Sequence, residues 1–272
     1  MLIADAHVHF HACFRRARFF DAAWHNLTGA APRVAPGEAL LPYLLLTESP
    51  GVDYFRRWCD ESGRSSRSSA RWRFEPTRED CSLAARREDG AEMIIVAGRQ
   101  VPTAERLEVL ALGTTDGIPQ GLPLRECLRR ARETARIVCV PWGFGKWSLS
   151  RGEVVREALE RADPSTFFLG DGAGRPRGRR LPRLFRIAAD HGIRVLPGSD
   201  PFPVGRHEGR AGTLCFAVAS AVDMEKPWER LAAAITDGAA LAPQGTHVGL
   251  MTFMRDQVEL RLARMARWGR ET

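Results

Sequence analysis

The sequence predicts a single α/β domain folded as a barrel, with strands in a central ring and helices around it. Short apolar runs alternate along the chain with amphipathic segments, which is the pattern of parallel strands joined by helices. A length of 272 residues is common for such a barrel. With 44% hydrophobic and 27% charged residues, the chain can form a sizeable core and a polar surface. We therefore expect one domain over residues 1–272.

Buried strands are predicted where apolar residues follow one another in short runs bounded by polar or turn-forming residues. Because helical segments separate most of these runs, we expect the strands to pair mainly in parallel. The predicted strands are Leu2–Ala6, Tyr43–Thr47, Met93–Ala97, Leu107–Leu112, Ile137–Pro141, Thr166–Leu169 and Arg194–Pro197.

Helices are predicted where apolar residues recur three or four positions apart and charged residues occupy the opposite side. These segments are Pro123–Thr134, Arg151–Arg161 and Leu181–His191. Ser150 and Glu153 have the spacing of a capping box at the start of the second helix. A basic amphipathic helix over Arg255–Arg267 is expected to pack against the barrel. Gly63–Arg73 is polar, basic and without periodicity, which predicts an exposed loop.

The net charge of +7 comes almost wholly from arginine, because Lys146 and Lys226 are the only lysines. Either a coding preference for arginine or the binding of anions explains this bias. Arginines are densest between Arg175 and Arg186, where they could neutralise the phosphates of a nucleic acid. No pattern of stacking aromatic residues accompanies them in the sequence, so a solvated helix face is favoured. Nucleic acid is therefore not expected as a partner.

The expected cellular location of the protein and the redox state of its cysteines are inferred from sequence features that are absent. No run of about eighteen apolar residues could span a bilayer, so no membrane association is expected. The first residues do not form a basic region followed by a long apolar stretch, and a cytoplasmic location is expected by default. The six cysteines show no paired spacing, which is typical of small core residues rather than a disulfide framework.

The strongest candidate for a functional site is the pair His7 and His9, which ends the first predicted strand. Strand alternation directs both imidazoles to the same side. At the carboxyl end of a barrel strand that side is the mouth, where two neutral imidazoles can bind zinc, manganese or iron. Asp200 follows the last predicted strand in a similar way, and its carboxylate could bind a metal ion or accept a proton from activated water.

At this point the chain resembles the PHP (polymerase and histidinol phosphatase) family. Asp5-Ala-His7-Val-His9 is similar to the opening motif of that family, and Pro197-Gly-Ser-Asp200 to its closing motif. Weaker matches at Leu44–Ser49, Val96–Gln100, Leu107–Gly113 and Cys139–Gly143 extend the resemblance over most of the chain. The resemblance implies a distorted (β/α)7 TIM-like barrel, a cluster of two or three metal ions, and hydrolysis of phosphate esters.

Several positions depart from the family pattern. Glu48-Ser49 stand where the family has Asp-His, Gln100 at a Glu position, Trp142 at a His position, and Pro201-Phe202 where a final His is usual. Because each metal ion needs several protein ligands, these losses should abolish a cluster. We expect at most one divalent ion, bound by His7, His9, Asp200 and the substitute carboxylate Glu48. Asp200 and Glu48 would also be the catalytic carboxylates, one of them acting as general base.

Polar and aromatic residues at predicted strand ends and loops are candidates for substrate binding, since such loops build the pockets of barrels. The aromatic, glycine-containing segment around Lys146 could hold a small anionic molecule. The candidates are Arg99, Gln100, Glu105, Trp142, Lys146, Asp171 and Arg175.

The residues favour a PHP-like hydrolase that acts on a small anionic substrate, such as a phosphoester, through metal-activated water. A barrel that has lost catalysis, binds no metal and serves as a binding or scaffold module is the first alternative. An amidohydrolase is the second, although His25, His191, His207 and His247 lie away from the central strands. The substrate, the oligomeric state, and the replacement of a lost ligand by His11 or His207 remain open.

Overall fold

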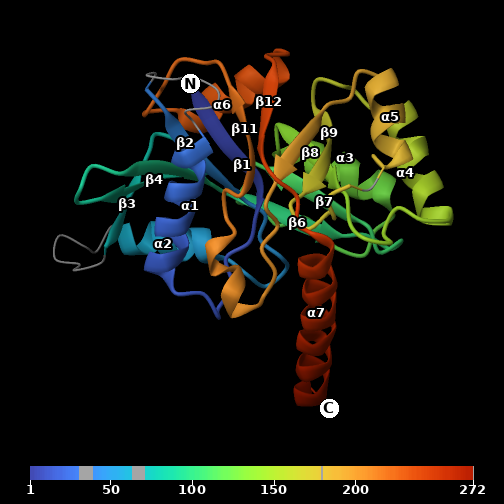
Figure 1. Ribbon diagram of the computed structural model, residues 1–272. Helices are drawn as coiled ribbons and strands as arrows, with labels where there is room; N and C mark the ends of the chain where they lie inside the picture. The colour runs from blue at the N-terminus through green and yellow to red at the C-terminus, as the bar shows by residue number, and fades with distance from the viewer. Residues whose placement is uncertain (31–38, 63–70, 179, 272) are drawn as a thin grey trace.

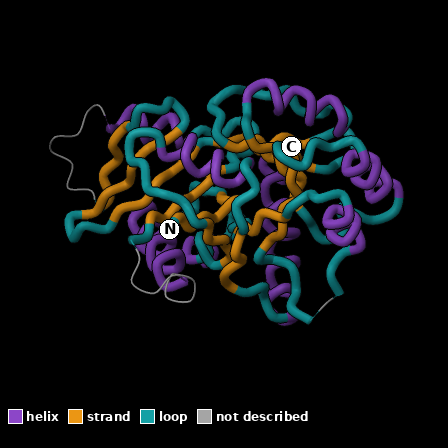
Figure 2. The backbone as a smooth tube through the Cα atoms, turned by 90° about the horizontal axis from the view of Figure 1, so that it is seen from above, coloured by secondary structure: helices purple, strands orange, loops and turns teal. Residues whose placement is uncertain are grey.

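The computed structural model describes residues 1–30, 39–62, 71–178 and 180–271, with side chains of the last helix placed as far as residue 262. Its strands form two sheets with helices packed around them (Figures 1 and 2). In the larger sheet the spatial order is β12 (Leu241–Gly245), β11 (Leu214–Val218), β1 (Leu2–Val8), β2 (Leu41–Leu46), β5 (Glu92–Val96), β4 (Ser82–Arg87) and β3 (Trp72–Pro76). In the smaller sheet it is β10 (Val195–Gly198), β9 (Phe167–Gly172), β8 (Ile137–Pro141), β7 (Glu108–Leu112) and β6 (Gly98–Pro102).

The helices divide between the two sheets. On the side of the larger sheet lie α1 (Arg16–Ala30) and α2 (Tyr54–Ser62), and α6 (Pro227–Thr236) covers its other part (Figure 1). Around the smaller sheet lie α3 (Leu124–Thr134), α4 (Ser150–Glu160) and α5 (Arg183–Asp190). The last helix is α7 (Leu250–Glu271).

The seven predicted strands and the three predicted central helices are all present, with boundaries shifted by a few residues. The mixed α/β class is thus confirmed, but the described strands do not pair into a closed barrel. Parallel pairing holds only within β1–β2–β5 and β8–β9–β10. The strand β7 runs antiparallel to both of its neighbours, β6 and β8. The expectation of a mainly parallel barrel was wrong in these places, because a hairpin joins β6 to β7, and β7 and β8 pair antiparallel although α3 lies between them in the chain.

Only a few backbone hydrogen bonds join the two sheets, at two seams. At the first, Asp200 N beyond β10 donates to His7 O of β1 at 2.8 Å. At the second, Glu48 N donates to Gly98 O at 3.0 Å, and Gln100 N donates to Glu48 O at 2.9 Å. The carboxyl ends of β1, β2 and β10 therefore converge on one place, together with the first residues of β6.

A buried carboxylate, that of Asp5, holds the first seam together. It accepts hydrogen bonds from three backbone amides: His7 N at 3.1 Å, Ser199 N at 2.9 Å and Gly212 N at 2.7 Å. These amides belong to β1, to the segment after β10 and to the segment before β11. Burial raises the pKa of Asp5 to about 6, although the hydrogen bonds from Ser199, Gly212 and His7 act in the opposite direction.

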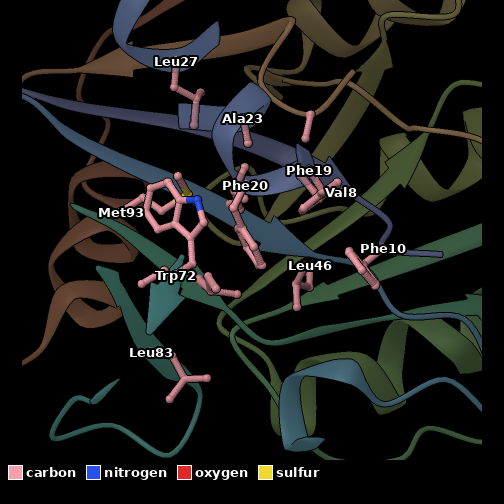
Figure 3. Close-up of a cluster of buried hydrophobic side chains, with 14 of the residues drawn as sticks. Val8, Phe10, Phe19, Phe20, Ala23, Leu27, Leu46, Trp72, Leu83 and Met93 are labelled. Carbon is pink, nitrogen blue, oxygen red and sulfur yellow. The ribbon is translucent and has the colours of Figure 1, made fainter. Parts of the chain in front are cut away.

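Aromatic side chains form much of the core on the larger sheet. Phe10, Phe19 and Phe20 pack with Trp72 between α1 and the strands (Figure 3). Trp72 corrects the predicted loop at 63–73, because Trp72 and Arg73 belong to β3 and the indole is buried. Residues 63–70 of that loop lie outside the described residues.

Only the first turns of α7 contact the body of the protein, where Phe253 and Asp256 are buried. The rest of the helix extends away from it (Figure 1), so the expected packing of Arg255–Arg267 along a barrel was wrong. Met251 and Val258 of this helix are exposed. Within the described residues, no helix is both long enough and apolar enough to cross a lipid bilayer.

Gly198→Ala should destabilise the fold, because a Cβ at this position would stand 2.4 Å from the Cβ of His7. We expect the free energy of unfolding to fall by about 1–3 kcal/mol, as for other overpacked sites. Gly172→Ala is the matched control, since Gly172 pairs with Gly198 in the ladder and its Cβ would meet no atom within 4 Å. Urea unfolding of both variants tests this prediction, and equal stabilities would contradict it.

Asp5→Ala should cost about 2–4 kcal/mol of stability, since it leaves three buried amide donors without their acceptor. Asp163→Ala is the control, because Asp163 also accepts a backbone hydrogen bond, from Ser165, but at an exposed site. That variant should lose less than about 1 kcal/mol. A similar loss in both variants, measured by chemical denaturation, would show that the buried carboxylate has no special role.

Candidate metal centre

Three side chains predicted as metal ligands come together at the first seam. His7 Nε2 and His9 Nε2 are 3.1 Å apart, and Asp200 Oδ1 lies 3.6 Å from the first and 3.7 Å from the second. Both histidines are buried, and Asp200 is partly exposed. Within the described part of the chain, this is the one group of such residues whose ligand atoms all lie within 4.8 Å of one another.

The spacing of these atoms fits a tetrahedral metal ion. Metal–ligand bonds of about 2.0–2.2 Å separate neighbouring ligand atoms by about 3.3–3.5 Å in a tetrahedron. The three distances bracket that range, so small side-chain movements would complete the geometry. Two imidazoles and one carboxylate also suit zinc, manganese or iron, and leave one position for water or substrate.

The charge states of two of these groups suit this role as well. Burial, followed by the nearby His7, lowers the pKa of His9 to about 3, so that His9 is neutral and can bind a cation through a lone pair. Burial acts to raise the pKa of Asp200, but His7, His9 and Lys146 outweigh it and hold that pKa below its ordinary value. The group therefore offers the neutral imidazole of His9 and the anionic carboxylate of Asp200.

Asp200 is placed by an unusual backbone conformation. Its φ is 45°, in the left-handed region that most residues other than glycine avoid and that aspartate and asparagine tolerate better than most. Its backbone amide is fixed on His7 O. The conformation therefore turns the side chain toward the two histidines instead of along the strand direction.

Gln100 also belongs to this site, because its Oε1 lies 3.0 Å from His7 Nε2. This residue stands where the resemblance has a glutamate, and its carboxamide keeps a neutral oxygen at that place. Thr47 was not predicted as a site residue, and its Oγ1 lies 3.5 Å from His9 Nε2. The feature that could have identified Thr47 as a site residue is its position directly after β2, at the same edge of the sheet as the histidines.

The structure does not bring the carboxylate of Glu48 to the metal group. Its Oε1 accepts hydrogen bonds from Tyr54 N and from Phe55 N (3.1 Å), at the start of α2. Its Oε2 accepts a hydrogen bond from Arg99 at 3.0 Å. Burial raises the pKa of Glu48 to about 7, while the amides and Arg99 act to lower it. Glu48 thus caps a helix and pairs with an arginine, a role that its sequence position did not reveal.

The other predicted substrate residues lie around this centre in different ways. Arg99 bridges Glu48 and the carbonyl oxygen of Thr115. Lys146 forms an ion pair with Glu108 and lies close enough to Asp200 to lower the pKa of that carboxyl. Trp142 is half-buried at the end of β8. Glu105 accepts hydrogen bonds from Leu124 N at the start of α3, away from the three ligands.

Asp171 and Arg175 form a bidentate ion pair in the loop after β9, with N–O distances of 2.8 and 2.7 Å. His247 joins them from the segment before α7, with Nε2 at 2.9 Å from Asp171 Oδ2. Sequence reasoning missed this third member, because nothing local relates residue 247 to residue 171. The three groups form a closed polar network at the same edge of the smaller sheet.

Neither His11 nor His207 is part of the three-ligand group. His11 Nε2 lies 2.8 Å from Pro201 O, and the ring stacks on His9 at 5.6 Å. His207 is fully buried, accepts a hydrogen bond from Phe202 N, and contacts Asp256. His207 thus has a structural role between the segment after β10 and the start of α7.

Asp171→Asn should make the protein less sensitive to acid. Burial acts to raise the pKa of Asp171, but hydrogen bonds from Arg175 and His247 outweigh it and hold the pKa below its ordinary value. A lowered carboxyl pKa stabilises the fold above the unfolded-state pKa of about 4, and that stability is lost as the pH falls through the folded-state pKa. Urea unfolding at about pH 6 and pH 3 should therefore show a smaller loss for the variant than for the parent protein. Equal losses would mean that the network adds nothing to acid stability.

Comparison with known proteins is informative only at the level of fold. No family model and no curated protein matches the sequence. Among solved structures, PsfC from Pseudomonas syringae PB-5123 is 13% identical, with a TM-score of 0.48, 97% of this chain covered and 98% of PsfC. The lesion-specific endonuclease EndoQ from Pyrococcus furiosus is 14% identical, with a TM-score of 0.50, 89% of this chain covered and 57% of that protein. A complex of endonuclease Q with a 27-mer duplex that carries an abasic lesion has a TM-score of 0.46 at 14% identity, over 88% of this chain and 57% of that one.

These similarities correct one expectation from the sequence. The endonuclease and PsfC are PHP-fold-like proteins, and the chain spans little more than half the length of the endonucleases. The sequence analysis did not expect nucleic acid as a partner, yet a solved structure of similar fold is a lesion-specific endonuclease. The expectation that excluded nucleic acid is therefore withdrawn.

Proposed function

We propose that this protein is a metal-dependent hydrolase of phosphoester bonds that uses one divalent ion. The observation that carries the proposal is the arrangement of His7 Nε2, His9 Nε2 and Asp200 Oδ1, whose mutual distances of 3.1–3.7 Å suit one tetrahedral ion. When bound, the ion supplies Lewis-acid activation of water and of the substrate's phosphoryl oxygen.

The residues of this chain have separate tasks in such a reaction. His7 and His9 would hold the ion as neutral ligands, with the main chain of His7 fixed by Asp5. Asp200 would bind the ion through one oxygen and could accept a proton from the attacking water through the other. Gln100 lies within hydrogen-bond reach of His7 and could orient the water or the substrate.

The substrate class is inferred from chemistry and from fold similarity. A neutral or anionic ester could reach the ion through the partly exposed side of Asp200. The motifs around His7 and Asp200 resemble a family that hydrolyses phosphate esters, and the solved structures of similar fold include an endonuclease. We therefore favour a phosphodiester or phosphomonoester over an amide, since no further histidine lies with the three ligands among the described residues.

A barrel-like binding module without catalysis is the second candidate. The position of Glu48 favours this candidate. Its carboxylate accepts hydrogen bonds from the first amides of α2 and from Arg99, so it does not provide a fourth metal ligand. With three protein ligands the affinity for metal is lower than with four, and the module would then act without an ion. Metal content separates the two candidates.

Metal binding and hydrolysis should depend on the same side chains. After equilibration with zinc, manganese or ferrous iron, the parent protein should retain about one ion per chain, measured by inductively coupled plasma mass spectrometry. Asp200→Asn and the His7→Ala/His9→Ala double variant should retain none and should lose at least about 100-fold in hydrolysis of bis-p-nitrophenyl phosphate. The asparagine is chosen because it tolerates the left-handed backbone.

His25→Ala is the control, because this histidine is exposed on α1 and should not affect bound metal. The melting temperature of each metal-free variant should stay within a few degrees of the parent. Retention of the ion by the double variant would reject the site, whereas bound metal without any phosphoesterase activity would favour the binding module.

A further inference from the structure

A pocket of about 520 Å³ lies between the loops that follow β8 and β9. Its volume is in the range of pockets that bind small organic molecules. Because β8, β9 and β10 are parallel neighbours, these loops and Asp200 lie at the same edge of the smaller sheet. The two helices after the loops, α4 and α5, lie side by side there (Figure 1).

One wall of the pocket is apolar and aromatic. It is formed by Trp142, Phe144 and Trp147 from the loop after β8, and by Leu184 and Ile187 of α5. Trp147 packs edge-to-face on Phe185, with ring centroids 5.3 Å apart. The indole Nε1 of Trp147 is buried and has no hydrogen-bond partner among the described residues. A buried donor of this kind is rare in folded proteins, and an acceptor on a ligand would satisfy it.

Among the described residues, the lining of the pocket also contains four arginines, and one of them, Arg183, lies close enough to Glu153 to act together with Arg156 in lowering the pKa of that carboxyl. Arg156 pairs with Glu153 and Glu160, and Arg175 pairs with Asp171. Arg180 and Arg183 are exposed at the rim and form no ion pair within the described part of the chain. These two guanidinium groups are therefore available for an anion, which they can bind through paired hydrogen bonds.

The two helices add partial positive charge to the same pocket. Both α4 and α5 begin at its lining, and neither has a side chain that caps its first amides. The capping box predicted for Ser150 is not formed, because the helix begins at Ser150 itself and Leu149 occupies the cap position. Uncapped amides at a helix start favour an anion, which reinforces the effect of Arg180 and Arg183.

The arginine-rich loop is held in place by the segment before α7. Arg177 N donates to Val248 O at 2.8 Å, and Val248 N donates to Ala173 O at 3.0 Å. The side chain of Arg177 also donates to Thr246 Oγ1 at 2.8 Å. The part of this loop around Ala173 and Arg177 is thus fixed against residues 246–248.

We propose that this pocket binds a nucleotide unit, with its phosphate at Arg180 and Arg183 and its base against the Trp147 wall. This inference rests on the proposed function, because it names the class of substrate on which the hydrolytic site at the same edge of the smaller sheet would act. Bases stack on aromatic side chains regardless of sequence, and arginines bind the backbone phosphates. The arginine stretch lacks aromatic residues of its own in the sequence, and the fold supplies them from the loop after β8. A strand held in this way would place a neighbouring phosphodiester toward the metal centre.

Fluorescence anisotropy of a fluorescein-labelled oligothymidylate tests the proposal, with the protein kept in EDTA. Arg180→Ala/Arg183→Ala should weaken binding about tenfold or more. The slope of log affinity against log salt should also become shallower by about 0.7, because the one phosphate that this arginine pair binds is no longer neutralised. The control is Arg161→Ala/Arg186→Ala, which removes two exposed arginines from the same region outside the pocket lining. It should bind within about twofold of the parent.

Trp147→Phe keeps an aromatic ring but removes the buried donor, and should weaken binding several-fold while leaving the melting temperature close to that of the parent. Displacement of the oligonucleotide by thymidine monophosphate would identify a free nucleotide as sufficient. If the monophosphate does not displace it and the Arg180/Arg183 variant binds weakly, the ligand is a strand. No binding by the parent protein, or equally weak binding by the two arginine variants, would overturn the proposal. Because metal is removed throughout, these outcomes are independent of the metal measurements.

Discussion

The position of the candidate metal centre depends on one buried carboxylate, that of Asp5. The two sheets share few backbone hydrogen bonds, so the ladder alone does not fix β1 against β10. Asp5 supplies the missing connection by accepting amides from β1, from the segment after β10 and from the segment before β11. The first of these amides belongs to His7, and the second, Ser199 N, directly precedes Asp200. The mutual position of two candidate ligands, His7 and Asp200, is therefore set by a carboxylate that does not itself belong to the three-residue group.

Much of the secondary structure could be predicted from the sequence because buried strands carry continuous apolar runs. The strand β3 was missed since its charged residues alternate with apolar ones, as in Trp72-Arg73-Phe74-Glu75. The strand β4 was missed because only a short apolar run, Leu83-Ala84-Ala85, precedes its two arginines. Closure of the barrel could not be predicted reliably, because it depends on how strands from distant parts of the chain pair. The hairpin of β6 with β7 reverses the chain direction and interrupts the parallel order.

Local sequence patterns and contacts between distant residues differ in the same way at the candidate site. His7, His9 and Asp200 were predicted because each follows an apolar strand directly, and strand direction carries them to one edge. Glu48 also follows a strand, yet the amides at the start of α2 take its carboxylate, and that choice depends on a helix that was not predicted. Asp5 had no predicted role beyond its place in a motif, and two of its three amide contacts join residues about two hundred positions apart. Such contacts leave no local pattern.

Residues 246–248 fix the loop after β9 through hydrogen bonds, and this has a consequence for protein engineering. The shape of that loop is not contained in its own sequence, since Val248 and His247 fix it from about seventy positions further along the chain. A transplant of the loop into another scaffold would lose its conformation unless this later segment travelled with it. Conversely, insertions within the segment would alter the loop without touching any of its residues. The two stretches form one exchangeable unit, although the chain between them includes α5, β10, β11, α6 and β12.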